Sequence, residues 1–236
     1  MKYALVTGST KGIGLAISSE LATRGYFVYI HYAYDDMAAE KVSFPQESHR
    51  KIKADLSSPA GVEILTEHII NDSIELDCLV LNAGATCRTP YGQIQYDDWN
   101  AVMNVNVNAP FFICQKLYPV IKNAGSIVII GSGMGIHPHA VSSAYSVSKA
   151  AAHMLARSLV KDFADHKIRV NAIAPGFIDT DWHGEKPQWL REKIESKIAL
   201  RRFGTTKEVA EACMFLIENT YVNGSVLQID GGYDFE

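Results

Sequence analysis

The stretch Thr7-Gly8-Ser9-Thr10-Lys11-Gly12-Ile13-Gly14 decides the fold, because it joins an apolar run to a helical pattern. The apolar run is Tyr3–Thr7, and the helical pattern is Ile13–Arg24. Glycines permit a tight turn, and a helix that begins there offers unpaired N–H groups and a partial positive charge to phosphates. The spacing is G-x-x-x-G-x-G, without the Gly-Lys-Ser/Thr ending of a P-loop. The stretch predicts a strand, a phosphate-binding turn and a helix, although a plain tight turn has the same composition.

The rest of the chain repeats this alternation of apolar runs and helix-length segments. The other runs, rich in Val, Ile or Leu on both faces, are Phe27–His31, Lys51–Ala54, Leu76–Asn82, Ser126–Gly131, Ile168–Ala174 and Val226–Ile229. Such runs are typical of a parallel sheet that helices cover on both faces. The other helical patterns are a short one, Asp35–Val42, and the longer Pro59–Asn71, Asp97–Asn123, Ala144–His166 and Lys207–Glu218. We predict a single-domain α/β fold, a Rossmann-type doubly wound sheet of about seven strands, over residues 1–236.

Composition narrows the class of protein. The 236 residues carry a formal net charge of −4, which gives no sign of the basic face that nucleic acids require. The apolar runs are far shorter than the ~20 residues that span a bilayer. The four cysteines form no C-x-x-C pair, so we expect buried, reduced thiols. We therefore expect a cytoplasmic protein that acts on neither nucleic acid nor membrane.

The end of the second strand bears on cofactor choice. A dinucleotide with a free ribose 2′-hydroxyl is usually held by a carboxylate there. Here Tyr32 ends the strand and the first acid is Asp35, whereas Lys11 in the glycine loop offers a cation to a 2′-phosphate and His31 could assist. We therefore predict NADP(H) rather than NAD(H). The alternative for Lys11 is a solvated surface lysine.

Two further turns could contact the same cofactor. Asp55, followed by Leu56, could accept a hydrogen bond from the adenine amino group, or it could be the N-cap of a turn before Pro59. The triplet Asn82-Ala83-Gly84 ends the fourth apolar run and combines two small residues with an amide. It suits a close backbone approach to a ribose, but it would also suit an ordinary turn.

Tyr145 and Lys149 are candidates for proton transfer. They are four residues apart in a helical pattern, which places both side chains on one face. A tyrosine ordinarily has a pKa near 10, and a nearby ammonium favours the tyrosinate, so Lys149 would lower the pKa of Tyr145. Most pairs with this spacing are surface residues, so the pair alone is weak evidence.

Two other polar residues could complete such a site. Ser132 ends the fifth apolar run, where its hydroxyl could orient a substrate oxygen or simply sit in a turn. Asn106 is the middle one of three asparagines at alternate positions in a predicted helix. Asparagine has a low helix propensity. An inward-facing Asn106 that holds a water near Lys149 would explain its presence, whereas Asn104 and Asn108 are expected to face solvent.

The order of these features resembles the short-chain dehydrogenase/reductase family. The resemblance covers nearly the whole chain and extends to Arg169-Val170-Asn171, Pro175-Gly176 and Asp230-Gly231-Gly232. It implies that Tyr145 moves the proton, Lys149 binds the nicotinamide ribose, Ser132 positions the substrate oxygen and Asn106 supports a relay water. It also implies that the nicotinamide is flanked by Pro175, Gly176, Ile178 and Thr180, and that the glycine loop holds the phosphates through Gly8, Ser9, Thr10, Lys11, Gly12, Ile13 and Gly14.

The resemblance is greatest to the 3-oxoacyl-acyl-carrier-protein reductases. It implies a small-molecule or carrier-linked acyl substrate, a lid over about residues 177–200, and a homotetramer. The expected substrate pocket comprises Ser132, Met134, His137, Phe177 and Trp182. Those reductases dock their carrier through basic residues where this chain has Asn123 and His166, which puts the carrier in doubt. The alternatives are another alcohol or ketone substrate (a sugar, polyol or cyclic ketone) and a non-catalytic cofactor sensor.

The sequence contains one pair of closely spaced histidines, His137 and His139. No matching third ligand lies nearby in the sequence, so we expect no metal site.

Overall fold

A seven-stranded, all-parallel sheet forms the centre of the computed structural model, which describes residues 1–45, 48–138, 143–180 and 186–233. The strand order is β3-β2-β1-β4-β5-β6-β7, as predicted for a doubly wound fold. The strands are β1 Lys2–Val6, β2 Tyr26–Tyr32, β3 His49–Lys53, β4 Leu76–Leu81, β5 Ile121–Ile130, β6 Arg169–Pro175 and β7 Val226–Ile229.

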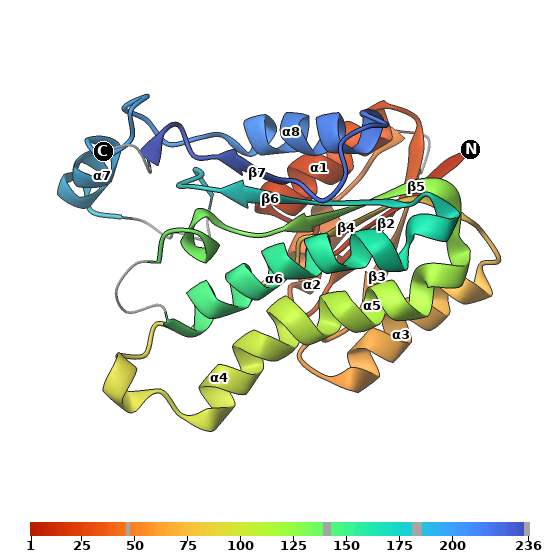
Figure 1. Cartoon of the computed structure of the whole chain (residues 1–236), viewed down its shortest axis with the longest axis horizontal. Coiled ribbons are helices and arrows are strands. Elements are labelled where there is room, and N and C mark those ends of the chain that lie inside the picture. Colours follow the sequence, from red (N-terminus) through yellow and green to blue (C-terminus); the bar gives the residue numbers. More distant parts are fainter. Residues whose placement is uncertain (46–47, 139–142, 181–185, 234–236) are drawn as a thin grey trace.

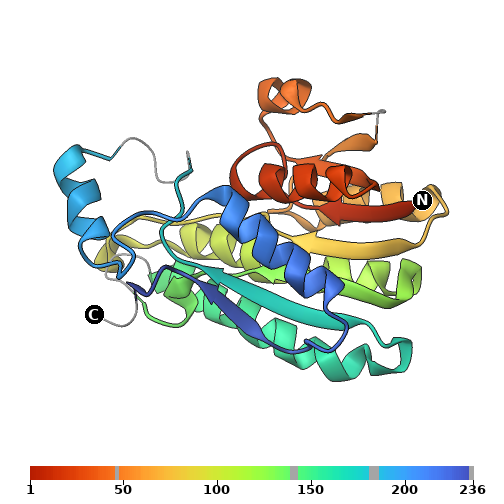
Figure 2. The same ribbon diagram turned by 90° about the horizontal axis from the view of Figure 1, so that it is seen from above.

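Helices cover both faces of the sheet (Figure 1). The helices are α1 Gly12–Thr23, α2 Asp36–Lys41, α3 Pro59–Asn71, α4 Tyr96–Met103, α5 Ala109–Leu117, α6 Ser143–Asp162, α7 Gln188–Glu195 and α8 Thr206–Glu218. Figure 1 shows α1 and α8 on one side of the sheet and α3, α5 and α6 on the other, and Figure 2 shows the strands side by side from above.

The sheet separates two apolar cores, one on each side, and most strands contribute to both. In β1, Ala4 and Val6 pack toward α1 and α8, while Leu5 between them packs toward α3, α5 and α6. This alternation follows from the period of two along a strand. Both cores are apolar, which is why these strands have the continuous apolar character that predicted a covered parallel sheet. All four cysteines are buried and unbonded, as expected.

The predicted helix Asp97–Asn123 is confirmed over most of its length, but it is not one regular α-helix and it ends before Asn123. The chain forms α4, then a π-helical segment at Asn104–Asn108, then α5, and β5 already starts at Ile121. Pro119 explains the early end of α5, because proline has no N–H to continue a helix. Regular pairing of β5 with β4 resumes at Ser126, the predicted start of the strand.

The reduced second helix is confirmed. It spans six residues, and the Asp35 carboxylate caps it by accepting a hydrogen bond from the Ala38 N–H at 2.9 Å. Within the expected lid, α7 is a helix that the sequence did not indicate, while residues 181–185, including Trp182, lie outside the described residues. In the part of the chain that the structure describes, every helix is too short or too polar to cross a membrane.

Candidate active site

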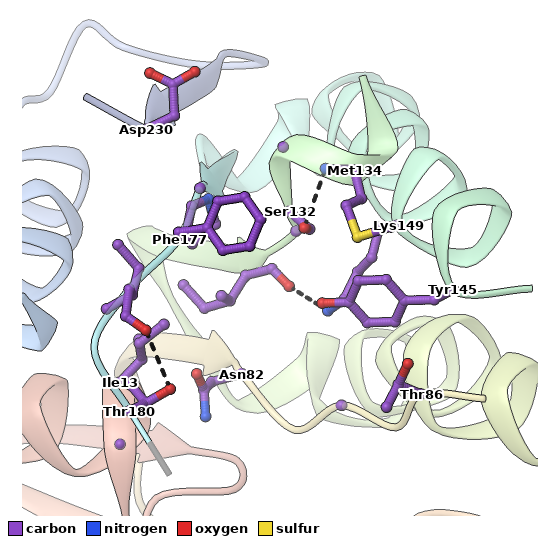
Figure 3. A pocket seen from close by; sticks show the side chains of 18 of the residues that line it. Ile13, Asn82, Thr86, Ser132, Met134, Tyr145, Lys149, Phe177, Thr180 and Asp230 are labelled. Atoms are coloured by element: carbon purple, nitrogen blue, oxygen red, sulfur yellow. Dashed lines mark hydrogen bonds between the residues drawn. The ribbon is translucent and has the colours of Figure 1, made fainter. Parts of the chain in front are cut away.

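A cavity of about 880 Å³ opens at the carboxyl ends of the central strands, where ligands bind in sheets of this type. It is the size of a site for a cofactor and a small substrate together. Figure 3 shows residues from the glycine loop, β4, β5, α6 and the segment after β6 turned into it. Its lining includes these residues predicted from the sequence: Gly8, Lys11, Gly12, Ile13, Asn82, Ala83, Gly84, Ser132, Met134, His137, Tyr145, Lys149, Pro175, Gly176, Phe177, Ile178 and Thr180.

The glycine loop has the close contacts that only glycine allows. Gly8 and Gly12 both have positive φ, at 62° and 56°. A Cβ on Gly14 would lie 2.3 Å from the Gly8 carbonyl oxygen, so α1 packs directly on the loop. A Cβ on Gly12 would instead point into the pocket, with the Thr180 side chain as its neighbour at 3.7 Å. The open face at Gly12 and the start of α1 behind it fit a pyrophosphate.

Asn82 supports this loop from the end of β4. Its side-chain amide donates to the Thr7 and Gly8 carbonyl oxygens at 3.0 and 2.9 Å, while the Thr7 hydroxyl accepts from the backbone N–H groups of Asn82 and Ala83. The two turns are therefore locked to each other. This arrangement fixes the floor of the pocket before any ligand enters.

His31 supports the loop from behind, which corrects its predicted role. Its Nδ1 accepts from the Gly8 N–H at 3.0 Å, so Nε2 carries the proton that bonds the Ala54 carbonyl oxygen at 2.9 Å. Burial lowers the pKa of His31 to about 4. The ring is therefore neutral near pH 7 and cannot act as a cation for a 2′-phosphate.

Other predicted cofactor residues also lie outside the pocket. Ser9 is fully buried, where its hydroxyl donates to the Val6 carbonyl oxygen, and Leu56 belongs to the apolar core. The Asp55 carboxylate accepts from the N–H and hydroxyl of Ser57. Its alternative role, as the cap of a turn before Pro59, is therefore confirmed, while Ser58 caps α3 itself. The full set outside the pocket lining is Ser9, Thr10, Gly14, His31, Tyr32, Asp55 and Leu56.

Lys11 reaches the rim of the pocket and pairs with an acid. Its ammonium lies 3.5 Å from the Asp35 carboxylate, and both side chains are largely exposed. The Tyr32 phenol hydrogen-bonds to Asp36, which in turn binds Lys53 at 2.6 Å. The end of β2 thus presents no carboxylate of its own, and the two acids that follow it are paired, Asp35 with Lys11 and Asp36 with Lys53.

Tyr145, Lys149 and Ser132 converge at the other end of the pocket (Figure 3). Tyr145 and Lys149 lie one turn apart on α6, and the Ser132 hydroxyl hydrogen-bonds to the Tyr145 phenol. The Lys149 ammonium is 4% exposed and donates to the Ile130 carbonyl oxygen at 2.8 Å. It lies 5.7 Å from the centre of the Tyr145 ring.

The protonation of this group differs from the prediction. Burial raises the pKa of Tyr145, and the hydrogen bond from Ser132 opposes this only in part. Burial also lowers the pKa of Lys149 to about 8. We expected the ammonium to lower the pKa of the tyrosine. In the chain itself, desolvation is the larger effect, because both groups lose water when they are buried.

Asn106 links the π-helical segment to the floor of the site. Its amide donates to the Ala85 carbonyl oxygen and the Ser148 hydroxyl, both at 2.9 Å, and its oxygen accepts from the Ala85 N–H at 2.8 Å. A Cβ on Gly84 would lie 3.5 Å from the Asn106 oxygen and 3.6 Å from the Lys149 nitrogen. Both groups therefore lie close to Gly84, whereas the water predicted between them stays a prediction.

The same segment shows why one asparagine differs from its neighbours. Asn106 is buried, whereas Asn108 is exposed and donates to Asn104, as expected for solvent-facing residues. A π-helical turn is a rare, locally unfavourable feature that often marks a functional site.

The sequence missed several residues of the wall. Thr86 and Arg88 follow Gly84 on the same loop, and Asp230 belongs to a motif that was noted without a role in the pocket. The remaining missed wall residues are Ile130, Gly131, Gly133, Lys186 and Tyr233. Their position in sequence relative to Gly84, Ser132 and Gly176 could have indicated most of them, and Lys186 lies within the expected lid.

Comparisons with known proteins extend along nearly the whole chain. A family model described as Enoyl-(Acyl carrier protein) reductase matches residues 8–234. A 3-oxoacyl-[acyl-carrier-protein] reductase from Aquifex aeolicus is 35% identical, over 98% of this chain and 96% of that protein. A hydroxynaphthalene reductase-like protein from Metarhizium acridum is 34% identical, over 98% and 94%. The solved structure of a short chain dehydrogenase from Burkholderia cenocepacia in complex with NADP is 31% identical, with a TM-score of 0.91 over 99% of this chain and 98% of that chain.

Proposed function

The chain belongs to the short-chain dehydrogenase/reductase family and is an NAD(P)-dependent oxidoreductase that acts on CH–OH groups, and we propose that it reduces 3-oxoacyl thioesters with NADP(H). One observation carries the proposal. The glycine loop lies at one end of a single cavity, and Tyr145, Lys149 and Ser132 lie at the other. A dinucleotide bound at the loop would therefore place its reactive end beside a proton donor.

The side chains divide the work as follows. The nicotinamide ring supplies or accepts the hydride. Tyr145, whose raised pKa keeps the phenol protonated near pH 7, donates its proton to the carbonyl oxygen during reduction. The Ser132 hydroxyl, already bonded to the phenol, orients that oxygen. Lys149 would hold the ribose beside Tyr145, and Asn106 would hold a water near Lys149 that returns a proton to the site.

The NADP(H) preference rests on the charges around Lys11. Lys11 is the cation on the rim beside the glycine loop, and β2 ends in Tyr32 without a carboxylate. The NADP in the solved short chain dehydrogenase structure supports the same choice. Because the Lys11–Asp35 pair is exposed, it is worth less than about 1 kcal/mol, and a 2′-phosphate can compete for the ammonium.

A titration tests this preference. NADPH should bind more tightly than NADH, and Lys11→Ala should weaken NADPH binding by about tenfold or more, since a hydrogen bond to a charged group is lost. NADH binding should hardly change. Lys207→Ala, which removes an exposed lysine outside the pocket, is the matched control. Tighter binding of NADH to the unaltered chain would overturn the preference.

The acyl substrate is supported by the relative named as a 3-oxoacyl-[acyl-carrier-protein] reductase. The carrier itself is less well supported, because Asn123 and His166 occupy the docking positions that are basic in such reductases. The basic residues next to them in the sequence, Lys122 and Lys167, differ in their surroundings. Lys122 is held by Asp77 at 3.3 Å, while Lys167 is exposed. We therefore expect the enzyme to accept a free thioester about as well as a carrier-linked one.

A substrate panel distinguishes the candidates. Acetoacetyl-coenzyme A, an acetoacetyl carrier protein, a cyclic ketone and an oxidised sugar are compared by NADPH consumption. Turnover of the thioesters supports the proposal. Turnover of the cyclic ketone alone would favour the second candidate, which the relative named as a hydroxynaphthalene reductase-like protein suggests.

We further propose a homotetramer formed through α5 and α6. Four large apolar side chains are exposed on these helices: Phe111, Phe112, Val147 and Met154. An interface between copies of the chain would cover large apolar side chains such as these. Phe112→Glu should reduce the mass measured by light scattering during gel filtration. An unchanged mass of the variant, or a monomeric unaltered chain, would contradict this interface.

A further inference from the structure

His153 is a buried polar side chain that the proposed reaction does not use. It follows Tyr145 and Lys149 on α6 at the same spacing of four residues, so the three share one face of the helix. Tyr145 and Lys149 point into the pocket. His153, one turn further on and 5% exposed, lies instead beneath the loop of residues 131–135 that carries Ser132.

The ring fits closely between two glycines of that loop. A Cβ on Gly131 would lie 2.1 Å from His153 Nε2, and a Cβ on Gly135 would lie 2.9 Å from its Cε1. Neither distance is possible for a real Cβ, so the loop can approach α6 only because both residues are glycine. The histidine and the glycines thus form one packed unit.

Within this unit, the ring binds the backbone of Ser132. His153 Nε2 lies 3.3 Å from the Ser132 nitrogen and accepts its N–H. Nε2 can accept only in a neutral ring whose proton is on Nδ1. Burial, together with the nearby Lys149 and Arg157 cations on the same helix, lowers the pKa of His153 to about 4, so this form is the one present near pH 7.

Ser132 is therefore tied to α6 at two points. Its hydroxyl bonds the Tyr145 phenol, and its N–H bonds His153, eight residues further along the helix. A hydroxyl that must meet both a phenol and a substrate oxygen needs a fixed backbone, because small displacements of a catalytic group reduce turnover strongly. An apolar side chain at position 153 could fill the space but could not supply this acceptor.

We propose that His153 is a positioning residue that sets the backbone of Ser132 and thereby the hydroxyl that orients the substrate oxygen. The inference rests on the proposed function, in which Ser132 performs that orientation. His153 touches no reacting atom in this scheme.

Two variants of similar size distinguish the role of a hydrogen-bond acceptor at position 153 from that of side-chain volume alone. His153→Met fills the slot without a strong acceptor, whereas His153→Gln can place an oxygen near the position of Nε2. We expect kcat to fall by about tenfold in His153→Met, with KM for the substrate and Kd for NADPH within about twofold of the unaltered chain. His153→Gln should recover most of the lost kcat.

Hydrogen exchange provides a readout that does not depend on turnover. The peptide covering residues 131–135 should exchange faster in His153→Met than in the unaltered chain, and His153→Gln should restore its protection. Unchanged exchange in His153→Met would overturn the proposal. Equal losses of kcat and of NADPH affinity in both variants would also overturn it, because they would indicate a structural role only.

Ser132→Ala separates this inference from the proposed function. If Ser132→Ala retains full turnover, the proposed role of Ser132 fails. If Ser132→Ala loses turnover but His153→Met keeps both its kcat and its exchange protection, the role of His153 fails alone.

Discussion

Lys149 carries an ammonium group in an almost dry environment. The backbone oxygen of Ile130 accepts a hydrogen bond from this ammonium, and burial lowers the pKa of Lys149 to about 8. Its neighbour Tyr145 has a raised pKa for the same reason, so the phenol keeps its proton near pH 7. A protonated phenol is the form that a carbonyl reduction needs. In this chain, the pocket alone therefore favours proton donation over proton removal.

Replacing that phenol gives the sharpest test at a single residue. Tyr145→Phe removes the proton donor and keeps the ring, so kcat should fall by about 10²–10⁴, the usual contribution of a general acid. The Kd for NADPH, measured by fluorescence titration, should stay within about threefold. Tyr221→Phe, at a tyrosine that is 98% exposed, is the matched control. Turnover of Tyr145→Phe close to that of the unaltered chain would remove Tyr145 from the mechanism.

The π-helical segment Asn104–Asn108 matters for where it places Asn106 rather than for its own stability. The wider turn places Asn106 inward, where it makes three hydrogen bonds to Ala85 and Ser148. Through them, the segment fixes the loop after β4 and the start of α6 to each other. An ordinary α-helical turn would shift this register by one residue.

Removing the Asn106 amide should therefore weaken the molecule and the site together. Asn106→Leu has a similar volume but leaves the Ala85 N–H and C=O without these partners, so the free energy of unfolding should fall by about 2–4 kcal/mol. Urea denaturation measures the loss, and kcat should fall in parallel. Asn108→Leu breaks an exposed bond to Asn104 and should cost about 1 kcal/mol or less. Equal stabilities of the two variants would contradict the linking role of Asn106.

Helices and strands whose formation depends on one dominant physical effect were predictable from the sequence. The strands buried on both faces had a continuous apolar pattern, and each appears where it was predicted to within a few residues, except for the start of β5. The break between α4 and α5 was not predictable from periodicity, because the apolar pattern continues through Asn104–Asn108. Only the run of asparagines gave a sign of it, and the effect of Asn106 depends on its Ala85 and Ser148 partners.

The residues of the site also divide into those that could be predicted from the sequence and those that could not. Gly12, Ser132 and Tyr145 could be placed in the pocket because strand ends and helix starts meet at one edge of the sheet. His31 was misread for a physical reason, since its position beside the loop was right but its burial could not be known. Burial changes the chemistry of an imidazole, because a neutral ring can accept a hydrogen bond where a cation cannot.

At the scale of the whole molecule, two such neutral histidines in the described part of the chain make stability depend on pH. His31 and His153 each have a pKa lowered to about 4 in the folded chain, against about 6.5 when unfolded. Above pH 6.5 neither the folded nor the unfolded state binds these protons, so the two histidines do not change the free energy of unfolding there. As the pH falls below 6.5, the unfolded chain takes up protons first and the folded state loses stability.

Carboxylates affect the free energy of unfolding in a different pH range. The pKa of Glu208 is lowered to about 2 by Arg202 and by the Thr205 N–H, and its stabilising effect is lost only as the pH falls below about 4.5. The pKa of Asp72 is also lowered, mainly by its hydrogen bond to Tyr29, so its effect too is lost only in the acidic range. A loss of stability between pH 6.5 and 5 should therefore come chiefly from the two buried histidines.

At pH 5, each buried histidine should cost about 2 kcal/mol of unfolding free energy relative to pH 7.5, because a difference of one pH unit corresponds to 1.36 kcal/mol. Urea denaturation at the two pH values measures the sum. In His153→Gln, the pH-dependent loss should fall by about half, since one of the two groups no longer titrates. In His68→Gln, at a histidine exposed on α3, it should stay the same. If His153→Gln lost as much stability as the unaltered chain, the ring of His153 would have to be protonated in the folded state already, and its Nε2 could not accept the Ser132 N–H.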